Sequence, residues 1–286
     1  MRTTFLFLIL CFFFFTACDK RKHEGNWYKG NLHTHTFWSD GDEYPEMVLK
    51  WYQEHGYNFV ALSDHNTISN GEKWIVVPKS ALYEKGFADY VNRFGADWVE
   101  YKTDTGRTQV KLKTFNQYRD KMLGENFLII HSEEISDQFM GAPIHMNVSN
   151  IQELVVPPGG NSPTEVMQNI VDLVLEQRES TGVAMIPHVN HPNFYWAITA
   201  QDFIPLQGER FFEVYNGHPL VHNYGDSLHM GTEQMWDVIN VAYAKRGQSL
   251  LYGLATDDSH SYHEFGAAFS NAGRGWIMVH ATRLAR

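Results

Sequence analysis

The sequence predicts an α/β protein with a mostly parallel sheet that closes as a barrel. Three observations lead to this prediction. Strand-like and helix-like patterns alternate along most of the chain, which favours parallel strands connected by helices. About 260 residues follow the N-terminal segment, a length that suits one α/β-barrel domain. Most predicted strands end in histidine or carboxylate side chains, and functional groups of parallel α/β barrels gather at the carboxyl ends of the strands.

Residues 1–17 are predicted to be a signal peptide. Arg2 supplies a positive charge, and residues 5–15 form an apolar run that is too short to span a membrane as a helix. The small residues before Cys18 resemble the lipobox of bacterial lipoproteins, in which the chain is cut before a cysteine that carries lipid. An ordinary secretory signal with an incidental cysteine is the alternative.

Residues 18–26 read as a polar tether. The chain is therefore expected to be an exported bacterial lipoprotein that faces the periplasm or the cell surface. Its contact with the membrane is expected only through lipid on Cys18.

Composition limits the chemistry of the mature domain. Cys11 and Cys18 are the only cysteines, so the domain has no internal disulfide and no thiolate metal ligand. Metal ions would have to bind nitrogen and oxygen ligands. The net charge of −10 argues against broad nucleic-acid binding, for which a basic surface is expected.

The predicted elements follow one another through a domain at residues 27–286. Residues 28–35 read as the first strand, residues 44–52 as a helix with Pro45 in its first turn, and residues 57–62 as a buried strand. Further strands are predicted at residues 126–130, 144–148, 183–186, 211–215 and 249–254. Long amphipathic helices are predicted at residues 162–179 and 232–246, each ending before a glycine.

An insertion at about residues 70–124 interrupts this alternation. The segment is polar and aromatic, and Arg107, Lys111 and Lys113 lie close together in it. These cations would either contact an anionic substrate or belong to a solvated cover over the barrel.

The first polar cluster belongs to the first strand. Side chains alternate along a strand, so His33 and His35 point to the same face. Two imidazoles aimed into one space suit a divalent metal such as Zn, Mn or Fe. Asp40, in a turn-forming Ser-Asp-Gly-Asp run, supplies a carboxylate to the same centre. Taken alone, the pair could also be two surface histidines.

The later strands add similar side chains at or near their ends. Unpaired buried charges are costly, and metal ions remove that cost. The recurrence of such clusters therefore indicates a multi-metal hydrolytic site. The side chains concerned are Asp64, His65, Glu133, Glu134, His145, His188, His191, Glu213, Asp257, Asp258 and His260.

Together these motifs resemble those of the PHP superfamily, named after polymerase and histidinol phosphatase. The resemblance covers the mature domain in motif order. Its members are metal-dependent phosphoesterases on a distorted seven-stranded β/α barrel, so the resemblance implies that fold and that activity here. It rests on His33-x-His35 with Ser39-Asp40-Gly41, Asp64-His65-Asn66, Glu134, His145, His191-Pro192 and Asp258-x-His260.

The resemblance also implies three divalent metal ions (Zn, Mn or Fe). By resemblance, the first would be held by His33, His35, Glu134 and Asp258. The second would be held by Glu134, His145 and His191. The third would be held by Asp40, His65 and His260. Asp64 would orient a ligand histidine from behind, as such carboxylates commonly do.

Several assignments have alternatives. Glu134 is preferred to Glu133, because the family's glutamate is followed by an aliphatic and then a small residue. His191 is preferred to His188, because the family's ligand precedes proline. His188 would then bind substrate, transfer a proton or be structural. Asp257 could be a turn or cap residue instead of a ligand, and Glu213 and Asn216 are assigned only to the wall of the site.

The expected reaction is hydrolysis of a phosphate monoester or diester by metal-activated water. His188, His218 or a metal-bound water would protonate the leaving group. The substrate would be a small or polymeric phosphoester outside the cytoplasm, such as a nucleotide, a sugar phosphate or a lipid head group.

Two other functions compete with this expectation. One is an amidohydrolase-like barrel enzyme that acts on C–N or C–O bonds; the absence of a lysine suited to carbamylation at a strand end argues against it. The other is a non-catalytic lipoprotein that binds metal or a glycan, against which the nearly complete ligand set argues.

Overall fold

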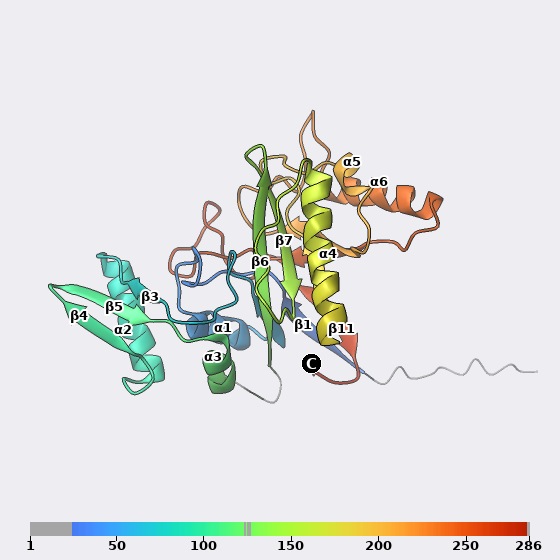
Figure 1. Cartoon of the computed structure of the whole chain (residues 1–286). Helices are drawn as coiled ribbons and strands as arrows, with labels where there is room; N and C mark the ends of the chain where they lie inside the picture. Colours follow the sequence, from blue (N-terminus) through green and yellow to red (C-terminus); the bar gives the residue numbers. More distant parts are fainter. Residues whose placement is uncertain (1–24, 123, 125–126, 285–286) are drawn as a thin grey trace, which may run out of the picture.

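The computed structural model describes residues 25–122, 124 and 127–284 (Figure 1). The predicted signal peptide, the lipid-bearing Cys18 and most of the tether lie outside the described residues. None of the helices among those residues is long and apolar enough to cross a membrane.

An eight-stranded sheet forms the centre of the molecule, in the order β10-β9-β8-β7-β6-β2-β1-β11. Most of the strands are short and largely buried, as expected of strands covered on both faces. Their bounds are β1 Asn26–Asn31, β2 Phe59–Leu62, β6 Leu128–Phe139, β7 Ala142–Ser149, β8 Ile186–Val189, β9 Phe211–Asn216, β10 Tyr252–Thr256 and β11 Ile277–Ala281.

The sheet closes almost completely into a barrel. Beyond the ends of β1 and β10, Thr34 and Ser259 form a parallel bridge. The amide of His35 donates to the carbonyl of Ser259, and the amide of Asp258 donates to the carbonyl of His33, both at 2.9 Å. β11 pairs antiparallel with β1 on the outer edge, which leaves seven strands around the barrel. The predicted fold class, an α/β barrel of distorted seven-stranded type, is confirmed.

Among the seven strands around the barrel, β7 runs against the others. β7 pairs antiparallel with both β6 and β8, whereas β1-β2, β2-β6, β8-β9 and β9-β10 are parallel pairs. A two-residue turn joins β6 to β7, with φ of 50° at Met140 and 83° at Gly141, the positive values that a tight hairpin turn requires. The expected strand–helix alternation therefore fails at this one step.

Helices pack around the barrel where the periodicity predicts them. α1 spans Pro45–Glu54, α4 Pro163–Thr181 and α6 Thr232–Lys245, and the short α5, Ala200–Phe203, is an additional helix that was not predicted. The side chain of Ser162 caps α4 at its start, and Gly182, with φ of 66°, ends it. The strand predicted at residues 183–186 lies three residues later, as β8, because residues 183–185 only connect the end of α4 to the sheet.

Residues 74–111 form a separate layer that projects from one side of the barrel (Figure 1). A three-stranded antiparallel sheet has the order β3-β5-β4 and packs with α2, whereas α3 packs against α1 beside the barrel. The bounds are β3 Trp74–Val76, α2 Ala81–Phe94, β4 Tyr101–Asp104, β5 Arg107–Lys111 and α3 Phe115–Met122. Trp38 and Tyr44, from the loop after β1, belong to the core of this layer and connect it to the barrel.

Candidate metal centre

The structure brings the nine predicted ligand side chains to one end of the barrel. β1 leads into His33 and His35, β6 and β7 carry Glu134 and His145, and β10 leads into Asp258 and His260. Because β7 is antiparallel, His145 reaches this end from near the start of its strand. The potential ligand atoms form three overlapping groups: the first is His33, His35, Glu134 and Asp258; the second is His65, Glu134 and His145; and the third is His35, Asp40, His65 and His260. His191 joins them beside Glu134.

The first group is buried and closely spaced. Nε2 of His33 and Nε2 of His35 are 3.2 Å apart. Each also lies 3.1–3.2 Å from Oε2 of Glu134 and 3.2 Å from Oδ1 of Asp258. Atoms with this spacing share a central point about 2.0–2.4 Å from all four, close to the Zn–N and Zn–O bond lengths in proteins.

The hydrogen bonds of His33 and Glu134 indicate that this group lacks a cation. Nδ1 of His33 lies 2.7 Å from Oε1 of Glu213; a carboxylate only accepts, so Nδ1 carries the proton and Nε2 presents a lone pair. Oε2 of Glu134 is buried and accepts no hydrogen bond from any described residue. Lone pairs that converge in a buried space are costly unless a proton or a metal cation lies between them. The four side chains therefore fit a divalent metal ion.

The electrostatics agree with this interpretation. Burial lowers the pKa of His33, but the carboxylates of Asp258, Glu213 and Glu134 outweigh burial and raise it well above its ordinary value. Burial raises the pKa of Glu134, yet His65, His33 and His145 hold it well below the usual range. The group thus keeps its carboxylates ionised and demands positive charge.

The second group surrounds the same glutamate. Oε1 of Glu134 lies 3.0 Å from Nδ1 of His145 and 3.3 Å from Nε2 of His191. Its other oxygen lies 3.0 Å from Nδ1 of His65. Asn190 donates its side-chain amide to Oε1 at 2.7 Å. Glu134 therefore lies between two groups of histidines, a position suited to a bridging ligand.

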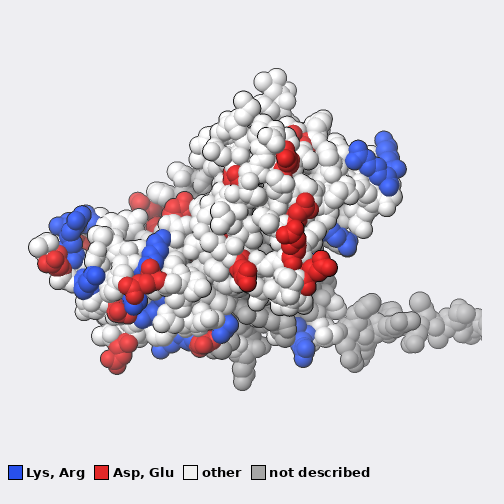
Figure 2. Space-filling model, in the orientation of Figure 1, with Lys and Arg blue, Asp and Glu red and all other residues white. Residues whose placement is uncertain are grey.

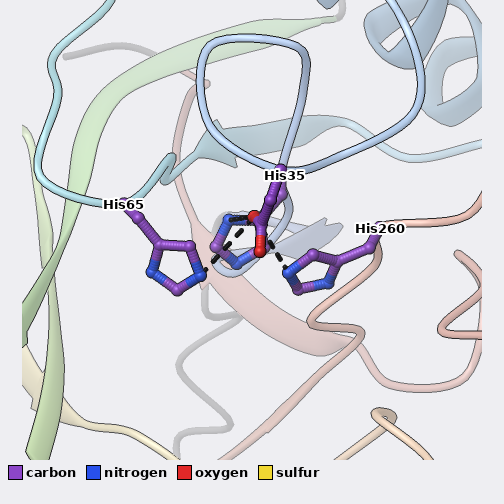
Figure 3. A group of neighbouring side chains, drawn as sticks. His35, His65 and His260 are labelled. Atoms are coloured by element: carbon purple, nitrogen blue, oxygen red, sulfur yellow. Dashed lines mark ion pairs between the residues drawn. The ribbon is translucent and has the colours of Figure 1, made fainter. Parts of the chain in front are cut away.

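The third group is more open to solvent. Oδ1 of Asp40 lies 3.3 Å from Nε2 of His260, 3.6 Å from Nε2 of His65 and 3.7 Å from Nδ1 of His35 (Figure 3). Burial raises the pKa of Asp40, but the three histidines, His260 foremost, lower it below its usual value. The Asp40 side chain is 59% exposed, so an ion held here would meet the solvent-filled cavity.

Glu213, on β9, contacts a predicted ligand histidine, whereas the sequence predicted only that it lies in the wall of the site. Its carboxylate is completely buried. Oε1 accepts hydrogen bonds from His33 and from Thr256, and Oε2 accepts from the amide of His191 and the side chain of Asn216, all at 2.7–2.9 Å. Only its position, as an acid inside an otherwise apolar strand, indicated a role.

Asp64 does not bond to a histidine ring as the prediction expected. It accepts hydrogen bonds from the amides and hydroxyls of Thr36 and Ser39, at 2.7–3.0 Å. Because the Ser39 hydroxyl donates to Asp64, it is free to accept from Nδ1 of His35, 3.2 Å away. Asp64 therefore reaches His35 through Ser39, and Glu213 is the carboxylate that contacts a ligand histidine.

The structure separates the residues between which the sequence left a choice. Glu133 points away from the centre, and its Oε2 accepts from the amide of Val155 at 3.0 Å. Asp257 accepts hydrogen bonds from Tyr52 and from the amides that follow Gly273, as a turn residue would. His188 is fully buried beside Glu213, 3.6 Å away, and is not among the side chains that line the cavity.

A cavity of about 740 Å³ opens over the three groups. His218 lines it, and burial lowers the pKa of this histidine to about 4. Nδ1 of His218 accepts a hydrogen bond from the amide of Leu220 at 3.2 Å. The neutral ring therefore carries its proton on Nε2, where it can donate. The insertion's Arg107, Lys111 and Lys113 are not among the residues that line the cavity. Lys111 instead pairs with Glu72 and Glu100.

No protein-family profile matches the sequence, and no curated protein matches it. Solved structures do resemble it. One is a two-domain protein from Bacteroides vulgatus that contains a predicted PHP-like metal-dependent phosphoesterase, with 14% identity and a TM-score of 0.45. The match covers 83% of this chain and 53% of that one, so the present chain spans about half of that protein.

Two other solved structures have similar folds. A protein from Bifidobacterium adolescentis, assigned as a metal-dependent phosphoesterase, is 11% identical with a TM-score of 0.41, over 82% of this chain and 88% of that one. An amidohydrolase from Chromobacterium violaceum is 13% identical with a TM-score of 0.38, over 81% and 87%. At these identities the site's own residues must carry the functional argument. Fold and site define an α/β-barrel protein whose clusters fit divalent metal ions.

Proposed function

We propose that this protein is a metal-dependent phosphoesterase that uses a trinuclear centre to hydrolyse a phosphate monoester or diester. The observation that carries the proposal is Glu134. Its buried carboxylate lies within 3.3 Å of nitrogen atoms from five histidines: His33, His35, His65, His145 and His191. One carboxylate among so many imidazoles suits a bridge between two ions.

Each ion would have its own set of side chains. His33, His35, Glu134 and Asp258 would hold the first; Glu134, His145 and His191 the second; and Asp40, His65 and His260 the third. Divalent ions bound there would act as Lewis acids towards phosphoryl oxygens and would acidify water. Nitrogen and oxygen ligands suit Zn, Mn or Fe.

The remaining residues would orient the ligand histidines and protonate the leaving group. Glu213 holds His33 with Nε2 towards the centre, and Ser39 does the same for His35. His218 presents a neutral N–H donor to the cavity, where it can bind or protonate the oxygen of a leaving group. No lysine or arginine is among the described residues that line the cavity, so the positive charge for a phosphate would come from the ions.

The lack of a lysine among the described residues of the cavity lining also argues against the amidohydrolase alternative. Without a lysine in the lining, the cavity offers no side chain for carbamylation. We therefore place phosphate esters first, and treat turnover of lactones or amides as the result that would favour the alternative. Metal binding without turnover of any of these compounds would favour a binding protein.

The test measures metal content and hydrolysis together. Purified protein should contain up to three divalent ions per chain and should hydrolyse p-nitrophenyl phosphate or its bis ester. His33→Ala and Asp258→Ala should abolish turnover and lose metal. The matched control is His55→Ala, because His55 is an exposed histidine stacked on Trp51, outside the site. Unimpaired turnover in His33→Ala would refute the assignment.

We further propose that the protein is exported and carries lipid on Cys18. A Cys18→Ser variant should move from the membrane fraction to the soluble fraction and should lose incorporation of radiolabelled palmitate. An unchanged distribution would contradict the lipid anchor.

A further inference from the structure

We propose that the substrate is a phosphoester of an uncharged, apolar alcohol or phenol, whose apolar part binds a preformed wall beside the metal centre. This inference rests on the proposed phosphoesterase function and adds the class of the leaving group. It follows from the lining of the cavity, the charge around it and the way one wall is held in place.

The cavity has two chemically different sides. Asp40, His65, His145, His191, Asp258 and His260 form the side that belongs to the metal centre. The rest of the lining is mostly apolar: Phe194, Pro219, Leu220, Ala267, Ala268 and Phe269, together with the polar His218, Ser261 and Ser270. A volume of about 740 Å³ is within the range of pockets that enclose drug-sized ligands. There is therefore room for a sizeable group in addition to a phosphate.

The charge around the cavity argues against a second anionic group on the substrate. No lysine or arginine is among the described residues of the lining. The loop after β9, residues 217–231, contains no lysine or arginine. In Figure 2 the uppermost tip of the molecule shows neither, and a Lys/Arg patch lies at the upper right. A carboxylate or second phosphate would face the apolar wall without a partner, which is strongly unfavourable. The ions would therefore bind the only anionic group.

Phe194 connects the wall to the reacting centre. Its half-buried ring lies 5.0 Å from the ring of His191 and 5.5 Å from the ring of His218, measured between centroids. A phosphate bound at the ions would thus place its leaving group against Phe194 and Leu220. Leu220 is 51% exposed, so an apolar group that covers it removes apolar surface from water.

The wall is fixed by contacts between two loops. Phe194 and Val221 form an antiparallel bridge, which joins the loop after β8 to the loop after β9. The side-chain amide of Asn193 donates to the carbonyls of His222 and Met230, at 2.9 and 3.0 Å. These contacts therefore hold the two loops together.

The residues after Phe194 have an unusual backbone. Tyr195 and Trp196 have φ of 51° and 55°, values that bulky side chains rarely adopt. The indole of Trp196 is stacked between the rings of His222 and His229, at 4.5 and 4.2 Å. Strain of this kind persists only where the surroundings impose it, and it concentrates at ligand-binding sites. A wall fixed in advance lowers the cost of ordering on binding.

Ligand binding tests the inference without requiring turnover. Protein loaded with Mn²⁺ is titrated calorimetrically with hexylphosphonic acid and with its analogue that carries a carboxylate at the far end of the chain. The two ligands present the same phosphonate to the ions and differ only at the wall. We expect the neutral-tailed ligand to bind about tenfold more tightly, with a negative heat-capacity change from apolar burial.

Variants of the wall residues test which side chains cause the preference for the neutral-tailed ligand. Phe194→Ala and Leu220→Ala should weaken binding of the neutral-tailed ligand about five- to tenfold and leave the carboxylated ligand unchanged. Leu220→Lys should improve binding of the carboxylated ligand. The matched control is Leu250→Ala, because Leu250 is also 51% exposed and precedes β10 at the opposite end of the barrel. It should change neither affinity.

The outcomes separate this inference from the proposed function. Equal affinities for the two ligands, or variants that weaken both equally, would overturn the inference. Selective binding together with no hydrolysis of hexyl phosphate or any other phosphate ester would support the apolar wall and refute the phosphoesterase. Hydrolysis of both hexyl phosphate and its carboxylated analogue at equal kcat/KM would refute the inference alone.

Discussion

Glu213→Gln tests whether the buried carboxylate behind the centre controls metal affinity. Each oxygen of Glu213 accepts two hydrogen bonds, from His33 and Thr256 on one side and from His191 and Asn216 on the other. Glutamine keeps the shape but replaces one oxygen by an NH₂ group, which would face two donors. Loss of two buried hydrogen bonds should cost about 2–5 kcal/mol of stability.

The expected effect on metal affinity depends on the tautomer of His33. Without a carboxylate at Nδ1, the ring is free to take the tautomer with its proton on Nε2, which cannot bind an ion. Removal of such a partner typically lowers metal affinity by about 10- to 100-fold. We expect that loss for the tightest ion in Glu213→Gln.

The assay is competition with a chromogenic chelator at pH 7, together with thermal unfolding and circular dichroism to show that the variant is folded. Glu133→Gln is the control, since Glu133 is a buried neighbour of Glu134 that accepts one hydrogen bond away from the centre. If folded Glu213→Gln bound metal as tightly as the wild type, the proposed positioning role would be wrong.

Three further predictions concern metal removal, pH and backbone packing. Removal of metal with a chelator should lower Tm by several degrees, because ions that bind only the folded state stabilise it; readdition should restore Tm, and an unchanged Tm would count against a metal centre. Burial raises the pKa of Glu43 to about 8 from its usual 4.5. The folded protein therefore holds a proton that the unfolded chain loses as pH rises, and stability should fall by about 3 kcal/mol between pH 4.5 and 7; urea unfolding of Glu43→Gln should show a flatter profile. A Cβ on Gly41 would lie 2.6 Å from the backbone of His35 and Thr36, so Gly41→Ala should displace the Asp40 loop, cost about 1–3 kcal/mol and lower the number of bound ions.

Local periodicity was enough to predict much of the centre. Alternation along a strand placed His33 and His35 on one side, and the structure retains this arrangement although both lie beyond β1. The choice of Glu134 over Glu133 has the same physical basis, since adjacent residues of β6 point to opposite faces. The site could be predicted at one end of the barrel because the carboxyl ends of most strands lie there.

Pairing between distant segments could not be predicted. Residues 144–148 read as a strand, but nothing in their pattern gives its direction, and the Met140–Gly141 turn lacks the Asn-Gly pair that signals such hairpins. Glu213 was left at the wall because its role depends on His33, which lies 180 positions away in sequence. The link from Asp64 through Ser39 to His35 depends on loop geometry that residue spacing alone does not determine.

The bridge between Thr34 and Ser259 joins residues 225 positions apart in sequence, and it has a consequence for the order in which the protein matures. His33 and His35 flank Thr34 on one side of this bridge, and Asp258 is next to Ser259 on the other. An ion held by His33, His35, Glu134 and Asp258 could therefore bind only after nearly the whole chain has been synthesised and these two segments have met. Such an ion would cross-link the earliest and latest parts of the domain. Its loss would release both at once.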